Sequence, residues 1–183
     1  MKPKKALWDT RLKRVIGDAI ADFQPVAQTG VAVAVLQNGG IAFSGGFGWR
    51  DRQSRKKVTA RTVFPIGSAT KAFNSMVLAI HAAPPHGNFT LDMPVTDYAP
   101  DFAMQQAKPT TDMTLVDMLS HQTGLPRNDA LWYLGPFSRC QLYFRLRGLA
   151  QINGAFRTAF LYNNLMYMTA GHLLEYLTGS AWE

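Results

Sequence analysis

The sequence contains a single cysteine, Cys140, among its 183 residues, so no disulfide can form within the chain. Only four histidines are present, and they are scattered without the spacing of metal ligands, so we expect no metal site. Every apolar run is shorter than the roughly 20 residues that cross a bilayer, so we expect no membrane span. These absences favour a globular chain. Hydrophobic residues make up 47% of the sequence, which is enough to form a core.

Acidic residues are also scarce, because 12 Asp and Glu stand against 19 Lys and Arg, for a net charge of +7. The basic excess lies in two clusters, at residues 2–14 and 50–57. Such a balance can indicate nucleic-acid binding, but stacking aromatic residues are not interleaved with these clusters, so we expect no nucleic-acid partner. Charged residues also interrupt the first 20 residues where a signal peptide needs an apolar run, which predicts a cytoplasmic protein.

The N-terminal third predicts one helix followed by a β-hairpin. Apolar residues recur at helical spacing from Leu12 to Phe23, which predicts a first helix that ends before Pro25. Residues 30–37 and 41–49 are strand-like and are separated by Asn-Gly-Gly, which is typical of a hairpin turn. We expect a bulge or bend at the glycines of the second arm and a solvated turn after it; the glycines are Gly45, Gly46 and Gly48, and the turn is 50–57.

The rest of the chain predicts four helices. They are expected at residues 68–83, at 114–124 with a capping box from Thr114 and Asp117, at about 138–151, and at 164–178 before Gly179. The first of them presents an apolar side formed by Phe73, Met76, Val77 and Ile80 and stops at two prolines. The stretch LDMPVTDYAPDF is rich in proline and acid, which predicts an excursion over the surface.

A serine and a lysine stand three residues apart in FPIGSATKAF, where the second helix begins. This spacing places Ser68 and Lys71 on one helical face, so that the amine can reach the hydroxyl and share or accept its proton. At a helix N-terminus the Ser68 N–H can also stabilise an oxyanion, and this geometry suits acyl transfer. Ser54 and Lys57 have the same spacing inside a charged turn with no apolar helix after it, so the spacing alone also fits an ordinary surface serine.

A second candidate group lies at Tyr162-Asn163-Asn164, where an extended segment enters the last helix. Tyr162 can act as a general base beside Lys71, and the Asn164 amide can hold a substrate carbonyl or the lysine. The alternative interpretation is that the Tyr162 ring packs in the fold and Asn164 caps the helix.

Four segments resemble, in order and spacing, the serine β-lactamase and penicillin-binding-protein superfamily, and are most similar to its class C-like branch. The segments are GGFGWRD with FPIGSATKAF, LDMPV, LVDMLSHQTGLPRND, and YNNLMYMTAGHLLEYLTG. The resemblance covers about residues 10–183. It implies an α+β, β-lactamase/DD-peptidase-like fold: a helical subdomain with the first hairpin of an antiparallel sheet.

The resemblance also implies roles for the candidate residues. It makes Ser68 the acylated nucleophile, Lys71 its proton partner, Tyr162 the general base or proton relay, and Asn164 a substrate-orienting amide. The implied substrates are small esters, amides, β-lactams or D-amino-acid peptides, and no cofactor is needed. We interpret His121 in LSHQTGLP as structural, because the lysine and the tyrosine already fill the role of the base. No Gly-x-Ser-x-Gly occurs, which argues against an α/β-hydrolase.

One motif of this superfamily does not occur in the sequence. Lys-Thr-Gly, on a later strand of the sheet, would supply a second oxyanion N–H, and the loss of such a donor costs about 10²–10³ in rate. We therefore expect residues 1–183 to form a single, incomplete domain, truncated before the later strands, whose unpaired sheet edge is a route to self-association. The competing hypothesis is a non-catalytic remnant or binding module of the same fold.

Overall fold

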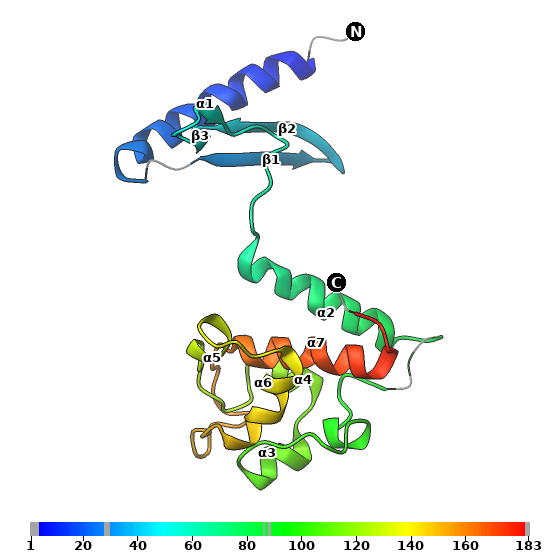
Figure 1. The fold of residues 1–183 in the computed structure, drawn as a ribbon. Coiled ribbons are helices and arrows are strands. Elements are labelled where there is room, and N and C mark those ends of the chain that lie inside the picture. The colour runs from blue at the N-terminus through cyan, green and yellow to red at the C-terminus, as the bar shows by residue number, and fades with distance from the viewer. Residues whose placement is uncertain (1–3, 28–29, 86, 88, 182–183) are drawn as a thin grey trace. The chain divides into compact units, whose positions relative to one another are not determined.

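The structure is a computed structural model, and it describes residues 4–27, 30–85, 87 and 89–181. The sequence predicted one domain, and the backbone contacts divide the chain into two compact units, Met1–Pro65 and Ile66–Glu183. Each unit has its own secondary structure (Figure 1). Within the described residues, every helix falls short of a membrane-crossing segment in length or in apolar character.

The first unit combines a long helix with the predicted hairpin. Helix α1 spans Lys4–Ala27 and contacts β2 of the antiparallel pair β1, Val31–Gln37, and β2, Gly40–Phe47. The prediction that this helix ends before Pro25 was wrong. Pro25 lies in the last turn of α1, where its missing N–H removes a hydrogen bond only at the end of the helix.

The second arm of the hairpin is irregular, and the predicted bend occurs at one of its three glycines, Gly48. The register shifts between Val35 and Leu36, and the bend comes after the strand at Gly48, whose φ is 72°. Gly46 has a different role, because a Cβ there would lie 2.5 Å from the backbone of Val58. The expected solvated turn is a second small hairpin, formed by β3, Trp49–Asp51, and β4, Lys56–Lys57.

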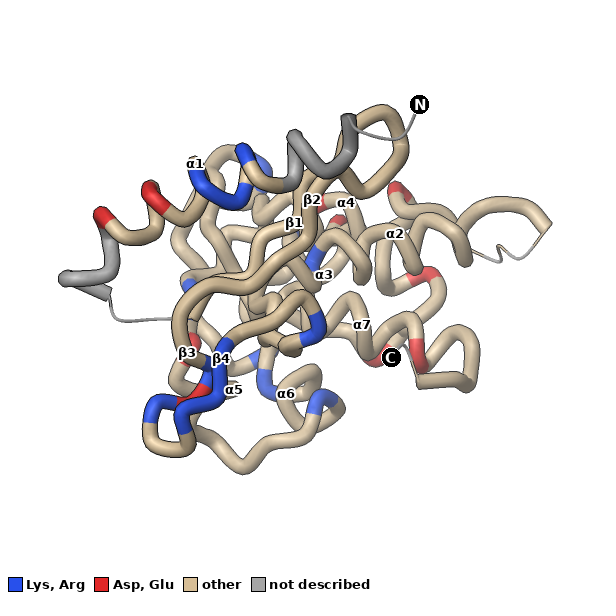
Figure 2. Tube along the Cα trace, turned by 90° about the horizontal axis from the view of Figure 1, so that it is seen from above, with Lys and Arg blue, Asp and Glu red and all other residues tan. Residues whose placement is uncertain are grey.

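Positive charge in the first unit gathers in two places. Lys and Arg lie along the described part of α1 and on the β3–β4 hairpin (Figure 2). Both described sheets are two-stranded, so β1 and β2 each keep one edge without a partner strand. Self-association through such an edge stays a prediction.

The second unit is helical and is built around its last helix. Helix α7, Asn164–Thr178, packs against α2, α4 and α6 (Figure 1). The bounds of the remaining elements are η1 Gly67–Ala69, α2 Thr70–Ala82, η2 Val95–Asp97, α3 Ala107–Asp112, α4 Leu115–Leu119, α5 Ala130–Tyr133, α6 Arg139–Arg145 and η3 Leu146–Gly148. Short α3 and α5 were not predicted, and the helix from Thr114 ends at Leu119 rather than at Gly124.

Caps fix both ends of α7 and the start of α4. Asn163 is the N-cap of α7, where its side chain accepts from the Met166 N–H, and Gly179 ends the helix with a φ of 68°. The predicted capping box is confirmed, because the side chains of Thr114 and Asp117 each bond to the other's backbone N–H.

The core of the second unit includes a segment that was predicted to lie on the surface. Val95 and Phe102, in the middle and at the end of the proline-rich stretch, are buried against the helices. Helix α2 also differs from the prediction: Asn74 and Leu78 form its buried face. Three residues of the predicted apolar side, Phe73, Met76 and Ile80, are each more than half exposed. The reason is that α2 carries apolar residues on two faces, and the pattern alone could not identify the face that packs.

An ion pair between the exposed Arg157 and the buried Asp117 ties the loop before the site to α4. Arg157 donates from Nε to Asp117 Oδ1 at 2.9 Å and from Nη2 to Oδ2 at 2.8 Å. Thr114 donates to the same carboxylate from its N–H and its hydroxyl. Burial opposes ionisation of Asp117, but the hydrogen bonds from Arg157 and Thr114 outweigh it and lower the pKa.

We expect Asp117→Asn to lower the free energy of unfolding by about 1–3 kcal/mol, because buried donors lose their acceptor. The matched surface change is Asp112→Asn, which removes one end of the exposed ion pair with Lys108. It should lower the free energy of unfolding by only about a few tenths of a kcal/mol. Urea unfolding followed by circular dichroism measures both. Since the folded pKa of Asp117 is lowered, its contribution is present above the unfolded pKa of about 3.9 and is lost as pH falls through the folded value. Equal stability of the two variants at neutral pH would contradict this role.

Candidate active site

The structure brings the four predicted site residues together. Ser68 lies in η1, immediately before α2, and its Oγ is 2.5 Å from Tyr162 Oη and 3.2 Å from Lys71 Nζ. Lys71 lies one turn later on α2, and Tyr162 and Asn164 flank the start of α7. Packing of α2 against α7 therefore joins two sequence segments that are 94 residues apart.

Asn164 holds the lysine and does not cap the helix. Its Oδ1 accepts from Lys71 Nζ at 2.6 Å, whereas the cap is the preceding residue, Asn163. The structure thus places Asn164 on the lysine, one of the two partners expected from the sequence. This contact limits where the ammonium group of Lys71 can lie relative to Ser68.

The surroundings of Tyr162 favour its phenolate. Hydrogen bonds with Lys71 and Ser68, together with the positive charges of Lys71 and Arg127, lower the pKa of the Tyr162 hydroxyl. Lys71 Nζ lies 4.8 Å from the centre of the Tyr162 ring, and the Arg127 guanidinium lies 5.3 Å from it. A tyrosine in such surroundings loses its proton at lower pH than an ordinary one, so more of it is in the phenolate form that a general base needs.

His121 supports the tyrosine from the other side. Its Nδ1 accepts from the Asn163 N–H at 3.0 Å, and its ring lies 4.5 Å from that of Tyr162. Burial and the Lys71 charge lower the pKa of His121, so the ring is neutral near pH 7. The Nδ1 atom of His121 is therefore bonded to the backbone at the start of α7. This contact agrees with the structural role that was expected for His121.

The second serine with a lysine three residues on lies in a different setting. Ser54 belongs to the turn between β3 and β4, and its hydroxyl and N–H both bond to the carboxylate of Asp51. Ser68, by contrast, bonds to a tyrosine and a lysine at the start of a helix. The same spacing thus gives a turn in one place and a candidate nucleophile in the other.

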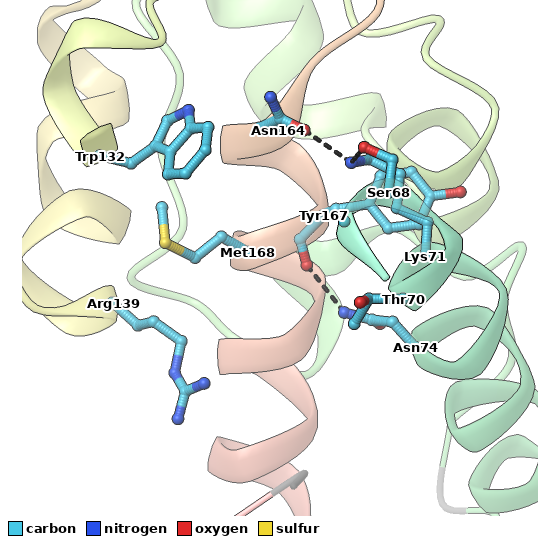
Figure 3. A pocket seen from close by; sticks show the side chains of 10 residues that line it. Ser68, Thr70, Lys71, Asn74, Trp132, Arg139, Asn164, Tyr167 and Met168 are labelled. Atoms are coloured by element: carbon cyan, nitrogen blue, oxygen red, sulfur yellow. Dashed lines mark hydrogen bonds between the residues drawn. The ribbon is translucent and has the colours of Figure 1, made fainter. Parts of the chain in front are cut away.

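A cavity of about 440 Å³ opens beside Ser68. It lies over α7, with α2 on one side and α5 and α6 on the other (Figure 3). Trp132 and Met168 provide apolar surface, and Arg139 is paired with Glu175 at 2.7 Å. Its lining consists of Gly67, Ser68, Thr70, Lys71, Asn74, Trp132, Arg139, Asn164, Tyr167 and Met168.

Three residues at this site were not identified from the sequence. Asp129 accepts from Asn164, Trp132 forms a cavity wall, and Arg127 lies over the Tyr162 ring. Arg127 and Asp129 end the family-like segment LVDMLSHQTGLPRND, and Trp132 lies just after it in the short helix α5, Ala130–Tyr133. The only signal available was their position at the end of that segment or just after it, and that position indicates no role for the side chains.

The described residues contain no group of three or more His, Cys, Asp or Glu side chains placed to hold a metal ion.

Comparison with known proteins identifies a family for this chain. Residues 20–183 match the family model described as Beta-lactamase. The unguisins hydrolase ungD of Aspergillus violaceofuscus is 34% identical over 158 residues, which are 82% of this chain and 27% of that protein.

Solved structures have the same fold. The octameric penicillin-binding protein homologue from Pyrococcus abyssi superposes with a TM-score of 0.76 at 22% identity, over 94% of this chain and 40% of that one. The D-amino acid amidase from Ochrobactrum anthropi SV3 gives a TM-score of 0.74 at 23% identity, over 93% of this chain and 46% of that one. The chain thus spans less than half the length of these relatives. The α+β, β-lactamase-like fold expected from the sequence is confirmed.

Proposed function

The chain belongs to the beta-lactamase family, and from this premise we propose that it is a serine hydrolase of esters or amides that reacts through an acyl-enzyme on Ser68. The observation that carries the proposal is the position of the Ser68 hydroxyl, which is within hydrogen-bond distance of both Tyr162 and Lys71. A nucleophile with a base that is itself oriented by a third group is the arrangement that acyl transfer needs.

In the acylation step, Ser68 Oγ bonds to the carbonyl carbon of the substrate while its proton passes to Tyr162 Oη. Lys71 stabilises the negative charge and shares the proton. The tetrahedral intermediate collapses when the carbon–oxygen or carbon–nitrogen bond to the leaving group breaks. The leaving group takes the proton held by Tyr162, and an ester on Ser68 remains.

In the deacylation step, the oxygen of a water molecule bonds to the same carbon and gives a proton to the Tyr162–Lys71 pair. The bond to Ser68 Oγ then breaks, the serine recovers a proton, and the acid product leaves. The N–H of Ser68 lies in the first turn of the η1–α2 segment, where N–H groups lack an intrahelical acceptor and can bind an oxyanion.

The substrate proposal follows from the cavity and the relatives. Trp132 and Met168 offer apolar surface next to Ser68, which suits a substrate with an apolar acyl side chain. The relatives include a hydrolase of unguisins and a D-amino acid amidase, so we propose peptides and amides before simple esters. No cofactor takes part in the proposed reaction.

The test is covalent labelling of the folded protein with a fluorophosphonate. We expect one added mass, located on Ser68 by peptide mass spectrometry and lost when the protein is unfolded before labelling. The variant Ser54→Ala is the matched control and should keep the adduct, because Ser54 only holds its turn. A well-folded sample without an adduct on Ser68 would favour the non-catalytic binding module instead.

A further inference from the structure

Asp129 stands at the centre of a hydrogen-bond network beside the candidate site. Its Oδ1 accepts from Asn164 Nδ2 at 3.0 Å and from Trp132 Nε1 at 2.9 Å. Its Oδ2 accepts from Arg127 Nε at 2.7 Å. Burial opposes ionisation, but these bonds and the Arg127 charge lower the pKa of Asp129, so it is a carboxylate near pH 7.

A carboxylate decides which way the Asn164 amide is turned. Ionised Asp129 can only accept hydrogen bonds, so the amide must present its NH₂ group to Asp129 and its oxygen to the opposite side. That oxygen accepts from Lys71 Nζ at 2.6 Å, and the same Nζ is 3.2 Å from Ser68 Oγ. Figure 3 shows the Asn164 oxygen directed at Lys71 and its nitrogen directed away.

Without that acceptor, the amide can turn by 180° and present its NH₂ group to Lys71. Two donors would then face each other, and the ammonium group would lose the contact that holds it near Ser68. Asp129 also fixes Trp132 in the cavity wall and Arg127 over the Tyr162 ring. Asp129 is therefore linked to Lys71 through Asn164 and to the Tyr162 ring through Arg127.

We propose that Asp129 is a positioning residue for proton transfer from Ser68, acting through the orientation of Asn164 on Lys71. The proposal rests on the proposed function, because it concerns the acylation step. It predicts that the rate of bond formation, rather than the binding of the reagent, depends on the side chain at position 129.

The first experiment compares Asp129→Asn with wild type in the reaction with a fluorophosphonate. Asparagine keeps the shape but can present an NH₂ group to Asn164. We expect the limiting rate of Ser68 modification to fall about 10-fold or more, with the half-saturating concentration changed less than threefold. The matched control Asp112→Asn makes the same chemical change on the surface and should react like wild type.

A double variant reverses the polarity of the contact. In Asp129→Asn/Asn164→Asp, the new amide at position 129 donates to the new carboxylate at 164, whose second oxygen faces Lys71. We expect this variant to regain part of the rate lost in Asp129→Asn, because the contact with position 164 is restored whereas Trp132 Nε1 still lacks the oxygen that accepted from it. A single variant that reacts at the wild-type rate, or a double variant no faster than the single one, would overturn the proposal.

A readout that needs no reaction separates this proposal from the proposed function. The side-chain amide signals of Asn164 in ¹H–¹⁵N spectra, assigned by their loss in Asn164→Asp, should shift and exchange faster with solvent in Asp129→Asn. If wild type is not labelled on Ser68 but these signals respond, the hydrolase function fails and the positioning stands. If the signals are unchanged in Asp129→Asn, the positioning fails whatever the activity.

Discussion

Lys71→Met is expected to lower the rate of covalent modification of Ser68 by about 10²–10⁴-fold while leaving the fold intact. The lysine Nζ lies 3.2 Å from Ser68 Oγ and 2.6 Å from Asn164 Oδ1, so it can both stabilise the developing oxyanion and share the serine proton. Methionine keeps an unbranched apolar side chain between α2 and α7 but provides no donor. The second-order rate constant of labelling, followed by intact mass, measures the effect.

The matched control for this variant is Lys108→Met. Lys108 is exposed and pairs with Asp112 one helical turn away, so its replacement removes a surface charge without touching the site. Labelling of Lys108→Met should proceed as in wild type. A Lys71→Met protein that reacts within threefold of the wild-type rate would show that Tyr162 alone accepts the proton, and the proposed sharing between the two groups would be wrong.

Local signals in the sequence predicted the elements that carry the site. Helix α7 was predicted with its observed bounds, because apolar residues repeat at helical spacing and Gly179 supplies a left-handed C-cap. The start of α2 was predicted because glycine, serine and an apolar run follow one another at Ser68. These features depend on neighbours in sequence, and a pattern can show them.

The residues that orient the site depend on neighbours in space. Asp129 lies 35 residues before Asn164, in a loop with no periodicity, and only the packed fold brings the two together. The role of Asn164 was likewise open from the sequence, since a cap and a lysine partner are equally compatible with an asparagine at a helix start. The structure assigns the cap to Asn163 and the lysine to Asn164.

Burial was the least predictable property. The proline-rich stretch reads as a loop over the surface, yet it supplies Val95, which is fully buried in the core. Conversely, Phe73 and Ile80 are apolar residues at helical spacing, and both are more than half exposed. Periodicity identifies a face of a helix, but only the partner element decides whether that face is covered.

The reaction at Ser68 is expected to accelerate with pH as Tyr162 loses its proton, with a midpoint below the ordinary tyrosine pKa of about 10. Hydrogen bonding with Lys71 and Ser68 and the positive charges of Lys71 and Arg127 lower the pKa of Tyr162, since each favours the phenolate. His121 also touches the ring, but its own pKa is lowered, so it stays neutral throughout this rise. A pH–rate profile of labelling measures the midpoint.

Two variants, Tyr162→Phe and Arg127→Gln, test whether Tyr162 is the titrating group, and Tyr176→Phe is the control. Tyr162→Phe should lower the rate by about 10²–10⁴-fold and remove the rise, whereas Tyr176→Phe, at an exposed position on α7, should keep both. Arg127→Gln should move the midpoint to higher pH, because it removes a positive charge 5.3 Å from the ring while keeping an N–H for Asp129. A midpoint that does not move in Arg127→Gln, or a rise that persists in Tyr162→Phe, would assign the titration to another group and leave Tyr162 without the role of general base.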